Sequence, residues 1–309
     1  MQFLYLLESI RNPVLDFFFS LITYCGDEVI FMAVGMIVFW CFSKNEGYYL
    51  LCVGFLGTVI NQFLKIVCRI PRPWIKDHNF TIVESAREAA TGYSFPSGHT
   101  QSSVGLFGGV ARWNKNKILR ITMIALCVIV PFSRMYLGVH TPADVLVSVA
   151  IALLLIFVGY PVFNKAISSP KKMYCVFGAL ALVMAVYLCF VCFYKFPADI
   201  DPHNFESAQK NGFTLMGCIL GIFAVYTVDI KWTKFETKAV WWAQIIKAAV
   251  GIGLVLTAKE LLKIPLNAIM PANTWARLVR YFLMVIVGGV FWPMTFKYFA
   301  KLGKKKEEN

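Results

Sequence analysis

Long runs of apolar residues constrain this chain more than any other feature of its sequence. Many of them approach the ~20 residues that a helix needs to cross the hydrocarbon core of a bilayer. Hydrophobic residues make up 58% of the 309 residues and charged residues only 15%, whereas a soluble globular domain carries roughly a quarter charged residues. The sequence therefore predicts an all-α fold, a polytopic helical bundle embedded in a membrane.

The apolar runs predict about nine transmembrane helices. Before the first of them, residues 3–24 are interrupted by charges and a proline, which predicts an amphipathic helix lying at the membrane interface. The expected spans cover residues 27–43, 48–67, 97–113, 118–134, 143–162, 173–194, 212–228, 241–262 and 278–299.

The basic residues predict how the chain is oriented. The net charge is +13, and the lysines and arginines fall in short loops between spans and in the tail from Lys301 onward. Basic loops stay on the cytoplasmic side of a membrane, so this placement indicates that the charges set the orientation of the chain. It does not indicate a nucleic-acid partner. Counting along the nine spans predicts that the C-terminus is cytoplasmic and that the polar clusters described next lie on the non-cytoplasmic face. We expect the membrane to be the plasma membrane.

Three short polar clusters carry the candidate chemistry. They provide two imidazoles, three cations, a serine in a glycine turn and a carboxylate, the groups needed to hold a phosphate and cleave its ester through a nucleophile. The first cluster is Lys65, Arg72 and Pro73, the second is Pro96, Ser97, Gly98 and His99, and the third is Ser133, Arg134, His140 and Asp144.

The first two clusters each have a second interpretation. Lys65 and Arg72 can face one pocket, even though Pro71 and Pro73 are expected to end the helix between them; alternatively they are cations snorkelling at a helix end. Ser97 and Gly98 form a turn before a span, where unpaired backbone amides can cradle an anion. The alternative is a capped helix start with His99 as an interfacial bystander.

The third cluster predicts a helix start and a catalytic pair at once. Thr141 suits the N-cap, Pro142 the first helical position and Asp144 the third, so that Asp144 could be only the acid of a capping box. It could instead reach back to a ring nitrogen of His140 and fix its tautomer. The two roles are compatible.

The order Lys-x6-Arg-Pro, Pro-Ser-Gly-His and Ser-Arg-x5-His-x3-Asp resembles the type-2 phosphatidate phosphatase superfamily, which includes glucose-6-phosphatases and vanadium haloperoxidases. The motifs span residues 65–144 within an expected phosphatase core of residues 1–165. Residues 166–309 would form an additional four-helix membrane region.

The resemblance implies a two-step hydrolysis without metal or cofactor. His140 would attack phosphorus and become a phosphohistidine, Asp144 would orient it, and His99 would protonate the leaving group. The phosphate oxygens would be bound by Lys65, Arg72, Ser97, Gly98 and Arg134.

The expected function is an integral membrane phosphatase for a lipid phosphate or diphosphate. Its substrate and partner in the membrane would be a polyprenyl pyrophosphate, phosphatidate, phosphatidylglycerophosphate or sphingoid phosphate. One alternative is a phosphatase for a soluble sugar phosphate, of the glucose-6-phosphatase type. Another is a non-catalytic lipid-binding protein or transporter.

Overall fold

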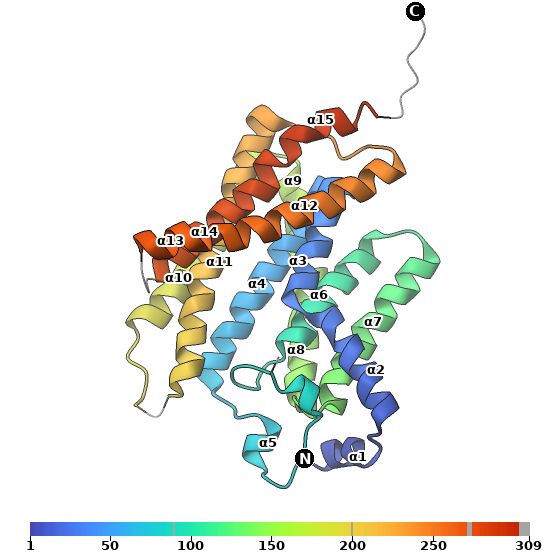
Figure 1. Ribbon diagram of the computed structural model, residues 1–309, viewed down its shortest axis with the longest axis vertical. Coiled ribbons are helices and arrows are strands. Elements are labelled where there is room, and N and C mark those ends of the chain that lie inside the picture. Colours follow the sequence, from blue (N-terminus) through green and yellow to red (C-terminus); the bar gives the residue numbers. More distant parts are fainter. Residues whose placement is uncertain (89, 199, 271–273, 303–309) are drawn as a thin grey trace, which may run out of the picture. The chain divides into compact units, whose positions relative to one another are not determined.

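The chain is helical throughout the part that the structure describes. This computed structural model describes residues 1–309 except 89, 199, 271–273 and 303–309, so most of the basic tail lies outside the described residues. No strand occurs among the described residues, which confirms the all-α prediction (Figure 1).

The α-helices are α1 Gln2–Ser9, α2 Pro13–Thr23, α3 Glu28–Ile37, α4 Lys44–Cys68, α5 Pro73–Lys76, α6 Gly98–Trp113, α7 Lys117–Tyr136, α8 Pro142–Phe157, α9 Gly159–Ile167, α10 Pro170–Phe193, α11 Pro202–Val228, α12 Trp241–Leu261, α13 Lys263–Ile269, α14 Thr274–Ile286 and α15 Phe296–Phe299. Short 3-10 and π turns accompany them at η1 Tyr24–Gly26, η2 Val38–Phe42, η3 Glu84–Ala86, η4 Asp229–Thr233, η5 Val287–Phe291 and η6 Pro293–Thr295.

The helices form two compact units that alternate along the chain. The first unit holds residues 1–34, 49–165 and 194–208, and the second holds the others. The predicted division into residues 1–165 and 166–309 stays a prediction.

Six helices are long and apolar enough to cross a membrane. They are Lys44–Lys76, Lys117–Tyr136, Pro142–Ile167, Pro170–Phe193, Pro202–Thr233 and Thr274–Phe299. A seventh candidate is the pair Pro13–Gly26 and Glu28–Phe42, which is bent by 53°. The predicted spans that correspond to α6 and α12 do not meet these criteria, so the count of about nine is not confirmed.

The N-terminal segment is built differently from the single interfacial helix expected over residues 3–24. The helix breaks after α1, because Asn12 caps α2 with its side-chain oxygen, which accepts a hydrogen bond from the Leu15 amide at 3.1 Å, and Pro13 occupies the first helical position. α2 and α3 together form the bent pair described above, which is a broken span or a re-entrant loop. The placement of residues 3–24 at the membrane interface stays a prediction.

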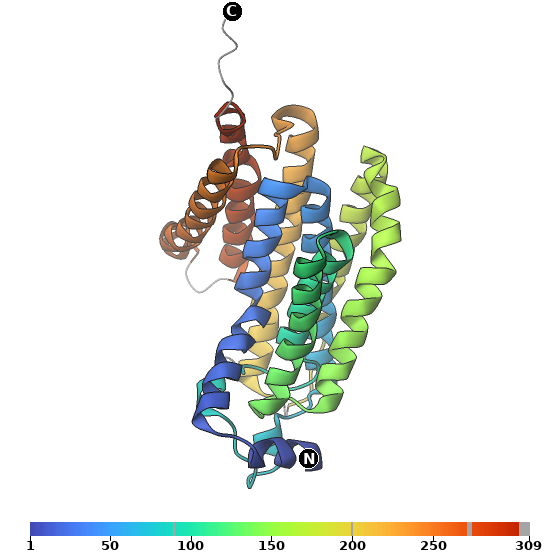
Figure 2. The ribbon, with the colours of Figure 1, turned by 90° about the vertical axis from the view of Figure 1, so that its right-hand side faces the viewer.

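Helix α6 is the centre of the first unit. It packs against α7 and α8 (Figure 2), and most of its serine, threonine and glutamine side chains are buried. Glycines allow this close packing: a Cβ on Gly108 would lie 2.7 Å from Ile156, and one on Gly109 would lie 2.6 Å from Leu50. Because neighbouring helices surround α6, it does not need the apolar surface of a lipid-facing helix such as α7, where Ile118, Ile121 and Val128 are exposed.

The second unit is tied together around the fully buried Lys247 on α12. Its ammonium donates to the carbonyls of Trp40 at 3.0 Å and Thr237 at 2.9 Å, and it lies 4.2 Å from the centre of the Phe296 ring. The indole of Trp292 donates to the Lys247 carbonyl at 3.2 Å. A buried ammonium needs hydrogen-bond acceptors inside the protein. Lys247 finds them on segments that are distant along the chain, and its bonds therefore hold these segments together.

Candidate active site

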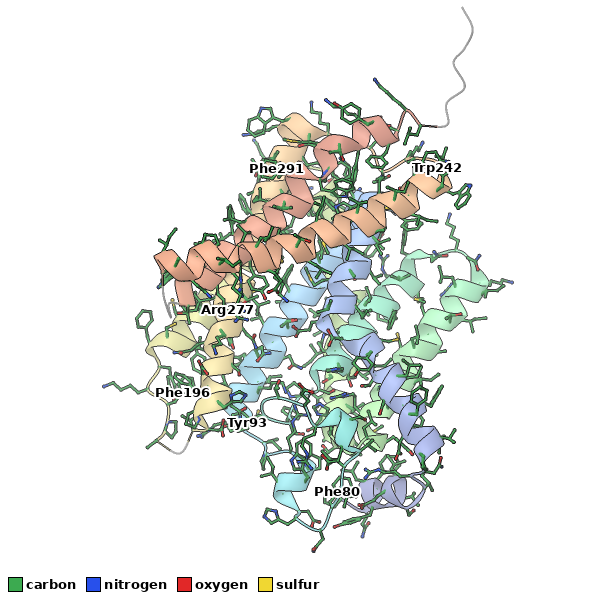
Figure 3. The ribbon with its side chains drawn as sticks, viewed as in Figure 1. Phe80, Tyr93, Phe196, Trp242, Arg277 and Phe291 are labelled. Atoms are coloured by element: carbon green, nitrogen blue, oxygen red, sulfur yellow. The ribbon has the colours of Figure 1, made fainter. Side chains whose placement is uncertain are left out.

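The structure brings the three polar clusters together at one end of the first unit. There α4 and α7 end while α6 and α8 begin. The Arg72 guanidinium contacts the His140 ring, with Nη1 3.0 Å from Nε2. The backbone amide of Ser97 donates to the Asp144 carbonyl at 3.2 Å. Figure 3 labels Tyr93 and Phe80, two residues at this end.

Helix α8 positions the His140 and Asp144 pair. Thr141 caps the helix and forms a capping box with Asp144, as the sequence predicted. The Asp144 Oδ2 atom accepts from the Thr141 amide at 2.8 Å and also lies 3.4 Å from the His140 Nδ1 atom. Both side chains of the pair are almost fully buried. The Asp144 carboxylate therefore caps the N-terminus of α8 and also faces the imidazole of His140.

The contacts of His140 define its tautomer. An arginine guanidinium can only donate hydrogen bonds, so the Nε2 atom facing Arg72 must carry the lone pair. The proton of the neutral ring then sits on Nδ1, toward Asp144. Burial lowers the pKa of His140 well below its usual value, and the charges of Arg72, Arg134, Lys65 and His99 lower this pKa further. The ring is thus neutral at neutral pH, and its Nε2 lone pair accepts the hydrogen bond from Arg72.

Arg72 is held by a ring of carbonyl groups. It immediately precedes α5 and is 4% exposed. Nε donates to the Gly92 carbonyl at 3.0 Å, Nη1 to that of Val139 at 2.9 Å, and Nη2 to that of Thr91 at 2.6 Å. The segment just before the second cluster therefore fixes this cation.

Lys65 is anchored on the same segment. It lies in the last turn of α4, which ends at Cys68 before Pro71, as the sequence predicted. Its ammonium donates to the Tyr93 carbonyl. Lys65 and Arg72 thus face one site rather than separate membrane surfaces.

The second cluster forms the start of α6. Ser97 is the N-cap, and its buried hydroxyl accepts from the Thr100 amide at 3.4 Å. Gly98 is the first helical residue and His99, which is half-buried, is the second. The positive end of the α6 dipole therefore adds to the cationic character of the site.

Arg134 completes the set of cations. It is 1% exposed at the end of α7, and its Nη1 donates to the Thr23 hydroxyl at 2.7 Å. Its Nε has no hydrogen-bond partner among the described residues. Ser133, in contrast, bonds within α7 through its hydroxyl, which donates to the Val130 carbonyl at 2.6 Å.

Three residues near the site were missed by the sequence reasoning. Ser94 is fully buried and donates to Asp144 Oδ2 at 2.6 Å. Thr23 bonds to Arg134 as described above. Asn61 is buried on α4, its amide nitrogen has no partner among the described residues, and its oxygen is the nearest atom to a Cβ built on Gly98, at 3.8 Å. Only Asn61 had a usable signal, since it lies one turn before Lys65 on the same helix face.

The arrangement is suited to an anion with several oxygens. Three cations and a helix N-terminus surround one neutral imidazole, and Asp144 is the acid that faces this ring. Among the described residues, no group of three or more His, Cys, Asp or Glu side chains could hold a metal ion. The site residues can therefore bind a phosphoryl group and present a nitrogen nucleophile to it.

Comparison with known proteins gives an independent view of the chain. Residues 46–168 match the family model of the PAP2 superfamily, and residues 213–305 match that of the PAP2 superfamily phosphatase transmembrane extension. No solved structure matches.

The similar curated proteins are lipid phosphatases. An undecaprenyl-diphosphatase of Bacillus subtilis is 29% identical, over 48% of this chain and 75% of its own length. A lipid A 4'-phosphatase of Porphyromonas gingivalis is 28% identical, over 52% of this chain and 71% of its own. A probable sphingosine-1-phosphate phosphatase of Dictyostelium discoideum is 31% identical, over 48% of this chain but only 38% of its own.

Proposed function

Because the chain is a PAP2 superfamily protein that carries the superfamily's transmembrane extension, we propose that it is an integral membrane phosphatase acting on a lipid phosphate monoester or diphosphate. The observation that carries the proposal is the contact between Arg72 and His140 Nε2, 3.0 Å apart, inside a buried group of cations. A cation beside a neutral nucleophile is the arrangement that phosphoryl transfer needs, because positioning and charge stabilisation provide most of its catalysis.

The first chemical step is attack by His140. When the phosphoryl group binds, the Arg72 hydrogen bond passes from Nε2 to a phosphoryl oxygen, and the negative charge of the substrate beside His99 keeps that ring protonated. The Nε2 lone pair of His140 then forms a bond to phosphorus while the bond from phosphorus to the leaving oxygen breaks, and protonated His99 donates a proton to that oxygen. Asp144 stabilises the positive charge that develops on the ring. The phosphoryl oxygens are bound by Lys65, Arg72, Arg134, Ser97 and the amide of Gly98.

The second step returns the enzyme to its starting state. A water molecule gives a proton to His99 and attacks phosphorus, the nitrogen–phosphorus bond breaks, and inorganic phosphate leaves. His140 recovers its lone pair. The proton balance closes within this site without a metal or cofactor.

The substrate we favour has a lipid tail. The site lies at one end of helices whose outer faces are apolar, for example at Ile121 and Val128 on α7, so a headgroup can enter while its tail stays in the bilayer. The relatives named above support a lipid substrate, because their names describe phosphatases of lipids. A soluble sugar phosphate remains the second candidate.

A phosphate-release assay tests the function. Purified protein in detergent is offered polyprenyl diphosphate, phosphatidate, phosphatidylglycerophosphate and sphingoid phosphate, with glucose 6-phosphate in a parallel series. We expect turnover of at least one lipid and little of the sugar phosphate. Preferential hydrolysis of the sugar would select the second candidate, and no hydrolysis of any ester would favour a non-catalytic lipid-binding protein or transporter.

We further propose nine membrane crossings, with the site on the non-cytoplasmic face of the plasma membrane and the C-terminus in the cytoplasm. In this topology α6 crosses as a helix covered by its neighbours, whereas α12 crosses with apolar side chains such as Ile245 and Leu254 exposed on its outer face. Labelling with an impermeant maleimide tests it, in a background without native cysteines. Asp77→Cys, at the site end, should react in intact cells, and Asn114→Cys, between α6 and α7, only after permeabilisation.

A further inference from the structure

The turn between α7 and α8, which carries His140, is folded around the backbone carbonyl of Arg134 in the last turn of α7. This oxygen accepts from the amides of Val139 at 3.2 Å and His140 at 3.3 Å. The backbone therefore links the position of the cation to that of the nucleophile. The guanidinium of Arg134 has to be oriented by contacts of its own.

One such contact comes from the N-terminal part of the chain. Thr23 ends α2 and is 6% exposed, and its hydroxyl accepts from Arg134 Nη1 at 2.7 Å. The Nε edge of the same guanidinium has no partner among the described residues. Because the guanidinium is planar, a bond at Nη1 also restrains where Nε and its proton point.

A second set of contacts holds this N-terminal segment against the turn. Arg11 donates from Nε to the Tyr136 carbonyl at 3.0 Å, and from Nη1 to the Thr81 carbonyl at 2.8 Å. Its guanidinium lies 5.3 Å from the centre of the Phe80 ring, which Figure 3 labels. Phe80 in turn closes on Gly138, whose φ of +81° and lack of a side chain permit the approach.

We propose that Thr23 is a positioning residue of the phosphatase: it orients Arg134 so that the unpartnered edge of the guanidinium faces the bound phosphoryl group. This inference rests on the function proposed above. It also extends the functional unit beyond residues 46–168, the segment that matches the superfamily model. The N-terminal helices thus contribute to phosphate binding as well as to membrane packing.

The test removes the hydroxyl acceptor of Thr23 while keeping the shape of its side chain. Thr23→Val removes the hydroxyl and Thr23→Ser retains it. Thr122→Val is the matched control, since within the described part of the chain the Thr122 hydroxyl bonds only to its own helix, at the Ile118 carbonyl. Two quantities are measured: kcat/KM for phosphate release, and the affinity for orthovanadate, a phosphate mimic, from the rise in unfolding temperature.

We expect Thr23→Val to lower kcat/KM and orthovanadate affinity by about tenfold or more, the size of effect that follows loss of a hydrogen bond to a charged group. Thr23→Ser and Thr122→Val should stay within about twofold of the wild type. Wild-type values for Thr23→Val, or equal losses in Thr23→Ser or Thr122→Val, would overturn the inference. If the wild type hydrolyses no ester, the proposed function fails, while orthovanadate binding still decides the role of Thr23.

Discussion

Asp144→Asn separates the charge of the site carboxylate from its hydrogen bonds. The asparagine oxygen can take the place of Oδ2 and still accept from the Thr141 amide and the Ser94 hydroxyl. The helix cap is then kept, and we expect the unfolding temperature to change little. What is lost is the negative charge opposite His140.

The distance to the ring gives the size of the loss. Oδ2 lies 3.4 Å from His140 Nδ1, and two unit charges at this separation attract by about 5 kcal/mol at an effective dielectric constant of about 20. Once His140 is phosphorylated its ring carries a positive charge that this attraction stabilises. Removing it should lower kcat by three to four powers of ten, since each 1.36 kcal/mol is about tenfold.

Steady-state phosphate release and rapid-quench measurement of the phosphorylated enzyme test this value. The control is Asp77→Asn, a carboxylate of the same unit that accepts from the Tyr5 hydroxyl at 2.9 Å outside the site. A fall of less than tenfold in Asp144→Asn, with the fold intact, would refute the electrostatic argument. An equal fall in Asp77→Asn would do the same.

Three further predictions concern His140 and Arg72. His140→Gln should abolish turnover and the acid-labile phosphoenzyme while orthovanadate binding persists; near-normal turnover would rule out His140 as the nucleophile. Arg72→Lys should lower kcat/KM by on the order of a hundredfold, because one ammonium cannot replace the bonds of a guanidinium to carbonyls on several sides; phosphate-release kinetics would measure it. Below about pH 6.5 the His140 ring takes up a proton in the unfolded chain. In the folded chain it stays unprotonated, because its pKa is lowered. Stability should therefore fall as the pH drops from 7 to 5, and by less in His140→Gln, as melting curves in detergent would record.

The sequence was a good guide wherever several residues carried one signal. The order and spacing of the clusters predicted that Lys65, Arg72, Ser97, Arg134 and His140 belong to one chemistry, and alternating helices explain why they meet. The helix start at Thr141 could also be predicted, because capping is local and depends on three consecutive residues. Whether Asp144 also faced the imidazole depended on the side-chain direction, which spacing alone left open.

The remaining features depended on packing that no local pattern records. Thr23 and Ser94 are single hydroxyl residues without a motif, and their partners lie 111 and 50 residues away. Helix α6 is only 16 residues long and rich in polar side chains, so hydropathy says little about whether it crosses the membrane. At the N-terminus, the cap at Asn12 divides the expected helix into α1 and α2.

Lys247 has a consequence for how the protein enters the membrane. In the proposed topology α12 crosses the membrane, and a lysine within a span opposes insertion by up to about 3 kcal/mol when the helix leaves the translocon alone. Its acceptors at Trp40 and Thr237 are both synthesised before α12. We expect this helix to insert efficiently only after the earlier segments have been assembled, so biogenesis of the extension depends on the order of synthesis.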